Sequence, residues 1–184
     1  MPPKKAAKKA AKKAAKKAPG HHDPHKAAKD ARRTFEHLGR VQALSSLTSS
    51  ERESLHLLTE SADAAYRVQR FKESADLLRA AEHLSFAALQ GEAQETVAGD
   101  LKTVIQEEFE HLLERSMEHA SHHDMPKTLL ALHARMTKDA KAALKRGSCR
   151  CALELARGAE ALAHVHDLGT NLLASPAARK GLKA

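Results

Sequence analysis

Apolar side chains recur along most of the chain at intervals of three and four residues, the spacing of one face of an α-helix. The first such stretch follows Asp23-Pro24, an N-cap with proline at the first helical position, and places Phe35 and Leu38 on one side. Gly39 predicts the end of this helix. No stretch alternates apolar and polar residues with the period of two typical of a β-strand. The pattern predicts an all-α fold of about six helices.

A second helix is indicated by a capping box, in which Ser50 and Glu53 bond to each other's backbone N–H groups. It is expected to run to about Val68 and to bury Leu55, Leu58, Ala62 and Ala65. A third helix is expected over about 71–89, ending at Gly91.

The next two helices are separated by a histidine-rich stretch. The fourth helix stops within 119–123, and its expected inward residues are Val97, Leu101, Val104, Ile105, Leu112 and Leu113. The fifth helix begins at Asp124 and Pro126 and ends at Gly147.

The sixth helix is expected to span roughly 149–168. Gly169 and Pro176 then separate a short basic C-terminal segment, 169–184. Residues 23–168 are therefore expected to form one compact helical domain.

An internal repeat relates two parts of this domain. A shift of 78 positions aligns 79–84 with 157–162, and the preceding helices align as well. Small residues fall where two antiparallel helices must approach closely; they are Ala62, Ser74 and Ala81, then Ala140, Ala152 and Ala159. This pattern resembles the tetratricopeptide helical hairpin, which implies degenerate hairpins at about 55–88 and 133–166. Chance pairing of alanine-rich helices is the alternative.

The N-terminal segment differs in composition from the rest of the chain. It repeats Ala-Ala-Lys-Lys and carries eight lysines without an acid: Lys4, Lys5, Lys8, Lys9, Lys12, Lys13, Lys16 and Lys17. The whole chain has 31 Lys and Arg against 23 Asp and Glu, so the formal net charge of +8 lies entirely in this segment. With nothing large to bury, residues 1–22 are expected to form a disordered tail.

The Lys/Ala composition of this tail resembles the tails of linker histones and of bacterial histone-like proteins. The resemblance implies binding to DNA or RNA by neutralising phosphates. Because the tail has no aromatic residue and no arginine, such binding is expected to be independent of base sequence. Another polyanion, an anionic membrane surface, or no partner at all are the alternatives.

Cysteine content and hydropathy limit the cellular compartments in which the protein is expected. Cys149 and Cys151 cannot staple a secreted scaffold, which favours a reducing environment. No apolar run approaches the roughly 18 residues of a membrane span, and the N-terminus lacks the apolar centre of a signal peptide. We expect a cytoplasmic or nucleoid-associated interaction or scaffold protein; the partner of its helical domain and its oligomeric state stay open.

Thirteen histidines raise the question of a metal site. The ligand set of a di-iron bundle is superficially matched by Glu53–His56, Glu108–His111, Glu36 and Glu82. Glu53 and His56, however, project away from their helix's apolar stripe. His119, His122 and His123 are the other candidates, because His119 and His123 lie one turn apart. We expect neither a dedicated metal site nor a cofactor, and a metal-binding helical bundle is an alternative.

An enzymatic alternative rests on Arg157 and His164, which resemble the Arg-x(4–6)-His motif of small helical ribonucleases of the HEPN class. The two residues share a helix face opposite Leu155 and Leu162, so a solvated face explains them equally well. No Gly-rich phosphate loop, nucleophile elbow or acid/base carboxylate pair is found in the sequence. We therefore expect a protein that is not an enzyme.

Overall fold

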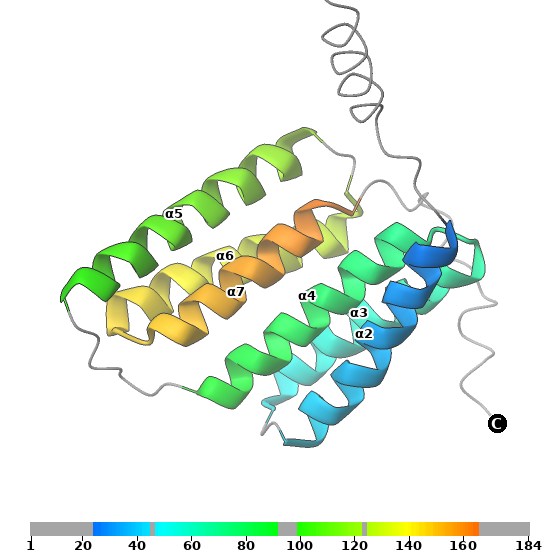
Figure 1. Ribbon diagram of the computed structural model, residues 1–184, viewed down its shortest axis with the longest axis horizontal. Coiled ribbons are helices and arrows are strands. Elements are labelled where there is room, and N and C mark those ends of the chain that lie inside the picture. The colour runs from blue at the N-terminus through cyan, green and yellow to red at the C-terminus, as the bar shows by residue number, and fades with distance from the viewer. Residues whose placement is uncertain (1–23, 45–46, 92–98, 123–124, 166–184) are drawn as a thin grey trace, which may run out of the picture.

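The computed structural model describes residues 24–44, 47–91, 99–122 and 125–165, in which every regular element is an α-helix. The helices are α2 (Pro24–Leu44), α3 (Ser49–Arg67), α4 (Phe71–Gln90), α5 (Gly99–His122), α6 (Lys127–Arg146) and α7 (Cys149–Ala163) (Figure 1). The predicted all-α class with about six helices is confirmed. The predicted tail, 1–22, and the C-terminal segment, 169–184, lie outside the described residues.

The first helix is longer than predicted. Gly39 does not end α2, which continues to Leu44, and a Cβ at Gly39 would meet nothing within 4 Å. Leu38 and Val41 are both buried, and burying an apolar side chain of this size gains about 1.5–3 kcal/mol, more than a helical glycine costs. Phe35, which was placed on the same side of the helix as Leu38, is 60% exposed.

The N-cap of α3 lies two residues earlier than predicted. Glu51 N–H donates to Thr48 Oγ1 at 3.3 Å, and Thr48 N–H donates to Glu51 Oε2 at 2.7 Å. Thr48 and Glu51 thus form the capping box, and the predicted Ser50–Glu53 box is wrong, although both pairs fit the same spacing. The predicted stripe of Leu55, Leu58, Ala62 and Ala65 is buried.

Helix α5 buries a different line of side chains from the one predicted. Leu112 and Leu113 are buried as expected, whereas Val104 is 56% exposed and Phe109, which was not predicted, is buried. At 100° per residue Val104 points about 140° away from Phe109, so both cannot face the core. Val97 and the side chain of Leu101 lie outside the described part of the chain.

Helix α7 is shorter than predicted, because it ends at Ala163 rather than near Leu168. The N–H groups of His164 and Val165 close the last turn onto Ala161 and Leu162. Val165 is then fully buried, so the chain leaves the helix against the core.

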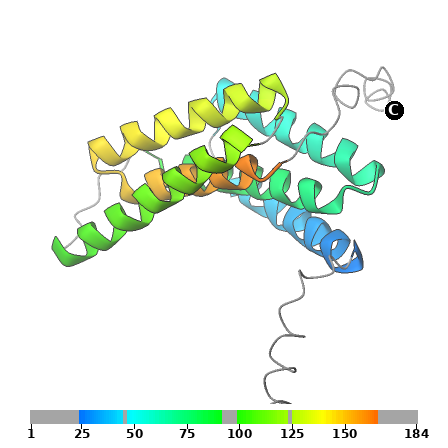
Figure 2. The same ribbon diagram turned by 90° about the horizontal axis from the view of Figure 1, so that it is seen from above.

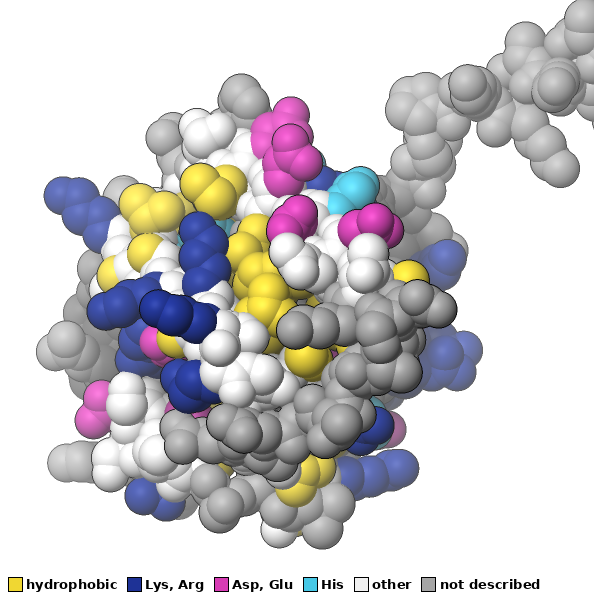
Figure 3. Space-filling model, turned by 90° about the vertical axis from the view of Figure 1, so that its left-hand side faces the viewer, with side chains coloured by type: hydrophobic (Ala, Val, Ile, Leu, Met, Phe, Trp, Pro, Cys, Tyr) yellow, Lys and Arg dark blue, Asp and Glu magenta, His cyan; other side chains and the backbone are white. Residues whose placement is uncertain are grey.

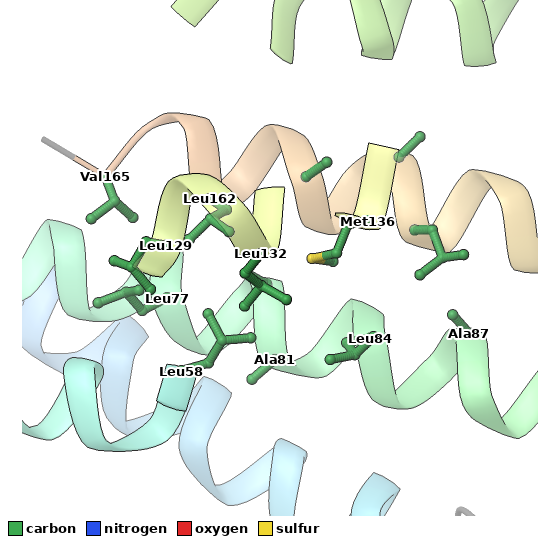
Figure 4. Packing of buried hydrophobic residues seen from close by; sticks show 14 of the residues in the cluster. Leu58, Leu77, Ala81, Leu84, Ala87, Leu129, Leu132, Met136, Leu162 and Val165 are labelled. Carbon is green, nitrogen blue, oxygen red and sulfur yellow. The ribbon is translucent and has the colours of Figure 1, made fainter. Parts of the chain in front are cut away.

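Helices α4 and α7 form the centre of the fold. They pack side by side and run in opposite directions, with α2 and α3 against α4, and α5 and α6 against α7 (Figure 1). Figure 2 shows α3 and α6 along one side of this central pair and α2 and α5 along the other. The core between them includes Leu58, Leu77, Leu84, Leu129, Leu132, Met136, Leu162 and Val165 (Figure 4). None of the described helices is both long enough and apolar enough to cross a membrane.

The shift of 78 residues relates three helices rather than two. It carries the start of α3 onto that of α6, the start of α4 onto that of α7, and the end of α2 onto that of α5. Ion pairs repeat with the same shift: Arg79–Asp76 with Arg157–Glu154, and His37–Glu82 with Arg115–Glu160. The domain therefore consists of two three-helix units, α2–α4 and α5–α7. Its resemblance to tetratricopeptide hairpins stays a prediction.

The turns inside the two units are also counterparts. Gln69 and Gly147 both adopt a positive φ, 62° and 85°. The next residue in each turn donates its N–H back into the first helix, Arg70 to Ala65 O at 2.9 Å and Ser148 to Ala143 O at 3.0 Å. Each turn thus satisfies helix-end carbonyls through a left-handed residue, and in the first unit that residue is not glycine.

The two units meet at equivalent positions. A Cβ placed on Gly158 would lie 3.4 Å from the carbonyl oxygen of Ala80, which is its counterpart in the first unit. In a two-fold interface, residues near the axis contact their own counterparts. The packing of α4 on α7 therefore resembles the interface of a homodimer joined into one chain.

Candidate functional site

The candidate polyanion-binding lysines, Lys4 to Lys17, lie outside the described residues. The described part of the chain adds a second basic feature on α6, which carries six Lys or Arg and one Asp. Its counterpart α3 carries two Arg against four Asp or Glu. Lys138, Lys141 and Lys145 are exposed and lie at helical spacing on one face. Residues 23–168 carry 20 Lys and Arg against 23 Asp and Glu, and this total conceals a local basic surface.

A groove of about 560 Å³ adjoins this surface, between the ends of α3 and α4 and helices α6 and α7. Leu84, Ala87 and Leu155 supply apolar lining. The charged lining residues are Arg135, Arg146, Glu51 and Asp139, two of each sign. Figure 3 shows hydrophobic side chains in a hollow of one face of the molecule, with Lys and Arg side chains gathered along its flank. The combination of apolar floor and charged rim is typical of a surface that binds another molecule.

Arg135 was not predicted from the sequence. It projects from α6 onto α3, donating from Nη1 to Ser50 Oγ at 2.8 Å and from Nη2 to Ser54 Oγ. The contact joins residues more than 80 positions apart, which no local spacing signals.

Arg157, the arginine of the ribonuclease alternative, lies in an ion-pair network. Its Nη2 is 2.7 Å from Glu108 Oε1 and its Nη1 is 3.0 Å from Glu154 Oε1. The hydrogen bond to Glu108 raises the pKa of Arg157 further above its ordinary value. Two carboxylates already compensate the charge of this guanidinium, so a phosphate would have to compete with both of them.

His164, the other member of that pair, caps the end of α7 and has different partners. Its ring lies on that of His119, with centroids 4.4 Å apart. Burial and the nearby His119 lower the pKa of His164, which favours the neutral imidazole. The structure thus gives Arg157 and His164 separate surroundings, and the ribonuclease alternative gains no support from them.

Asp76, a carboxylate that sequence reasoning did not single out, is buried beside this histidine pair. Its Oδ1 accepts from Arg79 Nη1 at 2.8 Å, while its Oδ2 is buried without a hydrogen-bond partner. Burial raises the pKa of Asp76, and Arg79 and Lys72 oppose that change. A signal did exist in the sequence, because acid and arginine recur three residues apart at the counterpart positions Glu154 and Arg157.

Both carboxylate oxygens of Glu154 have a partner, unlike those of its counterpart Asp76. Its Oε2 is 2.7 Å from His83 Nδ1, a contact that joins α7 to α4. Burial acts to raise the pKa of Glu154, but His83 and Arg157 outweigh it, and the pKa lies below its ordinary value. This pair therefore strengthens the interface between the two units.

Of the three predicted metal candidates, only His119 has a described side chain. His119 packs on His164, the side chain of His122 is not among those described, and His123 lies outside the described residues. Among the described side chains, no three His, Cys, Asp or Glu are grouped as metal ligands. In the di-iron pattern, Glu53, His56, Glu108 and His111 are exposed, Glu36 is exposed, and Glu82 pairs with His37. Cys149 is buried, Cys151 is partly exposed, and both are free thiols.

Comparisons with protein-family models, with curated proteins and with solved structures gave no match for this chain. The functional assignment therefore depends on its own residues.

Proposed function

We propose that this protein is a non-enzymatic helical interaction or scaffold protein, tethered to nucleic acid or another polyanion by its lysine tail without sequence preference. The observation that carries the proposal is the division of charge. The eight lysines of residues 1–20 account for the entire excess, and the remaining residues balance at 23 basic and 23 acidic groups. Such a tail neutralises phosphates and releases counterions, giving a salt slope of at most about −7 on duplex DNA.

The helical domain would supply the second half of the function. Its groove between α3, α4, α6 and α7 offers apolar and charged groups to a protein or peptide partner. The exposed lysines of α6 lie close to that groove, since Arg146 and Asp139 of the same helix line it. A polyanion held by the tail and a partner held by the domain would then be brought together on one chain. We also propose a cytoplasmic location, near the nucleoid where DNA is the polyanion.

Deleting residues 1–20 tests this proposal. We expect the shortened protein to lose binding to duplex DNA and to RNA at moderate salt, measured by fluorescence anisotropy, while its helix content and melting temperature stay unchanged. A tail of the same composition in scrambled order should restore binding, because phosphate neutralisation depends on the number and spacing of charges. Replacing all eight lysines by glutamine is the matched control and should abolish it.

Four outcomes would overturn the proposal. Full affinity of the shortened protein would move the binding to the domain, where Lys138, Lys141 and Lys145, or Arg32, Arg33 and Arg40, would be the first residues to replace. Strong preference for one sequence would contradict an electrostatic tether. Cleavage of RNA, or stoichiometric metal in protein purified without an affinity tag, would replace the proposal with the HEPN-like ribonuclease or the metal-binding bundle.

A further inference from the structure

The outer face of α6 carries four lysines in one stripe. Lys127, Lys138, Lys141 and Lys145 are all exposed, and we call them the lysine ridge. At 100° per residue they fall within about 60° of one another around the helix. At 1.5 Å per residue they extend over about 27 Å of its length. Helix α6 packs against α7, and Figure 2 shows it at the outer edge of the molecule with no other labelled helix over this face. The ridge is therefore open to a long ligand.

No acid compensates the charge of the ridge. The one acid of α6, Asp139, lies at least about 100° around the helix from every ridge lysine and lines the groove instead. None of the four lysines pairs with an acid among the described residues. Lys138, Lys141 and Lys145 follow one another at three and four residues, so like charges are neighbours, which weakens a helix. The stability of α6 itself therefore does not account for the ridge.

The counterpart helix shows that packing does not require these lysines either. In α3, Glu60 and Asp63 hold the positions of Lys138 and Lys141. Each of the two acids pairs with a basic side chain four residues away on α3, at 3.2 Å and 2.8 Å. The same face is thus balanced in the first unit and carries positive charge without a partner in the second.

The composition of the ridge favours phosphates over a protein partner. The exposed residues between its lysines include Ala131 and Ala134, which are small and leave the ammonium groups outermost. The only large apolar side chain exposed on α6 is Leu130, near its first turn. Protein interfaces gain most of their binding energy from buried anchors near the centre, which the ridge lacks. Phosphate neutralisation requires only charge, and a duplex offers about one negative charge per 1.7 Å of its axis.

Helix α2 carries the other exposed cluster of basic residues and differs from the ridge. Arg32, Arg33 and Arg40 are exposed, but the exposed Glu36 lies one turn from each of them. Figure 2 places α2 on the opposite side of the central pair from α6. These arginines therefore provide a control with the same number of charges at a different place.

We propose that the lysine ridge of α6 is a second nucleic-acid contact, which binds the phosphate backbone of a duplex held also by the lysine tail. The inference takes its ligand from the proposed function, but it concerns the folded domain and is tested apart from the tail. Each engaged lysine steepens the dependence of log affinity on log salt concentration by about 0.9. The four lysines of the ridge therefore add at most about 3.6 to the slope that the tail produces.

Replacing three ridge lysines in the full chain tests the proposal. Lys138→Gln, Lys141→Gln and Lys145→Gln together remove three charges and keep good helix formers. We expect the affinity for a short labelled DNA duplex, measured by fluorescence anisotropy, to fall at least about tenfold at about 0.1 M salt. The salt slope should become shallower by about 2.7. Arg32→Gln, Arg33→Gln and Arg40→Gln together are the matched control and should leave the slope unchanged, and circular dichroism should show equal helix content in both variants.

A protein whose eight tail lysines are replaced by glutamine isolates the ridge. Lowering the salt from about 150 to about 20 mM strengthens four phosphate contacts about a thousandfold. We therefore expect this protein to bind the duplex weakly at the lower salt concentration, and the three ridge substitutions to remove that binding. Unlabelled duplex should displace the labelled DNA at a lower concentration of charge than polyglutamate does.

The proposal is overturned if the ridge variant keeps the affinity and slope of the unchanged protein, or if the glutamine-tail protein does not bind at low salt. Equal losses in the ridge and α2 variants would also overturn it, because net charge alone would then explain them. Equal displacement by polyglutamate would assign the ridge to an acidic protein instead. The tether fails separately, if the glutamine-tail protein binds at moderate salt as tightly as the unchanged protein does.

Discussion

Gly158, at the crossing of α4 and α7, offers the most direct test of how the two units are joined. A Cβ at this position would overlap Met136 Cε and lie 3.3 Å from His83 Cβ. Met136 is only 1% exposed, so its methyl group cannot swing into solvent. We expect Gly158→Ala to destabilise the domain although alanine is the better helix former.

The magnitude follows from two opposing contributions. Replacing a helical glycine by alanine gains about 1 kcal/mol in the free energy of unfolding. Forcing an extra methyl group into a packed core costs about 1–3 kcal/mol. The net loss is therefore about 1 kcal/mol, which lowers the melting temperature by about 4 °C for a domain of this size. Gly39→Ala is the matched control, because nothing lies within 4 Å of its new Cβ, and it should gain about 1 kcal/mol.

The internal repeat supplies the compensating change. The first unit has Leu58 and Ala80 where the second has Met136 and Gly158. Adding Met136→Leu to Gly158→Ala reproduces the first pair, removes the overlapping methyl group, and should restore stability to within about 0.5 kcal/mol of the starting protein. Urea unfolding followed by circular dichroism at 222 nm measures all four proteins. Stabilisation by Gly158→Ala alone, or no recovery in the double variant, would refute the reasoning.

Two further predictions concern backbone strain and pH. Gln69→Gly should raise the free energy of unfolding by about 0.5 kcal/mol, because glycine adopts a positive φ without steric cost, and Gly147→Ala should lower it by about 1 kcal/mol; urea unfolding measures both, and a less stable Gln69→Gly protein would contradict this. Burial lowers the pKa of His133 and of His164 below 6.5, so the unfolded chain takes up protons that the folded chain does not. Stability should therefore be fully present above pH 6.5 and decline as the pH falls below it, less steeply in His133→Gln; stability that stays constant from pH 7 to 5 would rule this out.

The helices were predictable because amphipathic spacing requires no knowledge of tertiary contacts. Their ends were less so, because the local signals were ambiguous. Thr48 and Ser50 each precede a glutamate by three residues, and only the geometry of the chain before α3 decides between them. Glycine is common at helix ends, so Gly39 indicated one. The helix continues past it because Val41 is buried in the core.

Much of the candidate site could not be predicted, because it depends on contacts between helices distant in sequence. Arg135 meets Ser50 only once α6 lies on α3. The exposure of Phe35 likewise follows from how α2 packs, since its helical spacing alone placed it on the same side as the buried Leu38. The repeat did carry usable information, because a shift of 78 positions aligns Arg79 of α4 with Arg157 of α7, and both arginines pair with an acid three residues earlier.

Counterpart positions separate the demands of packing from those of binding. Leu77 with Leu155, and Leu84 with Leu162, are the same residue in both units and are buried, so close packing of the central helices accounts for them. Arg32 corresponds to Glu110, and Asp63 to Lys141, so the charge is reversed where the side chains are exposed and packing sets no requirement. A ligand that binds through charged groups would therefore find a different surface on each of the two units.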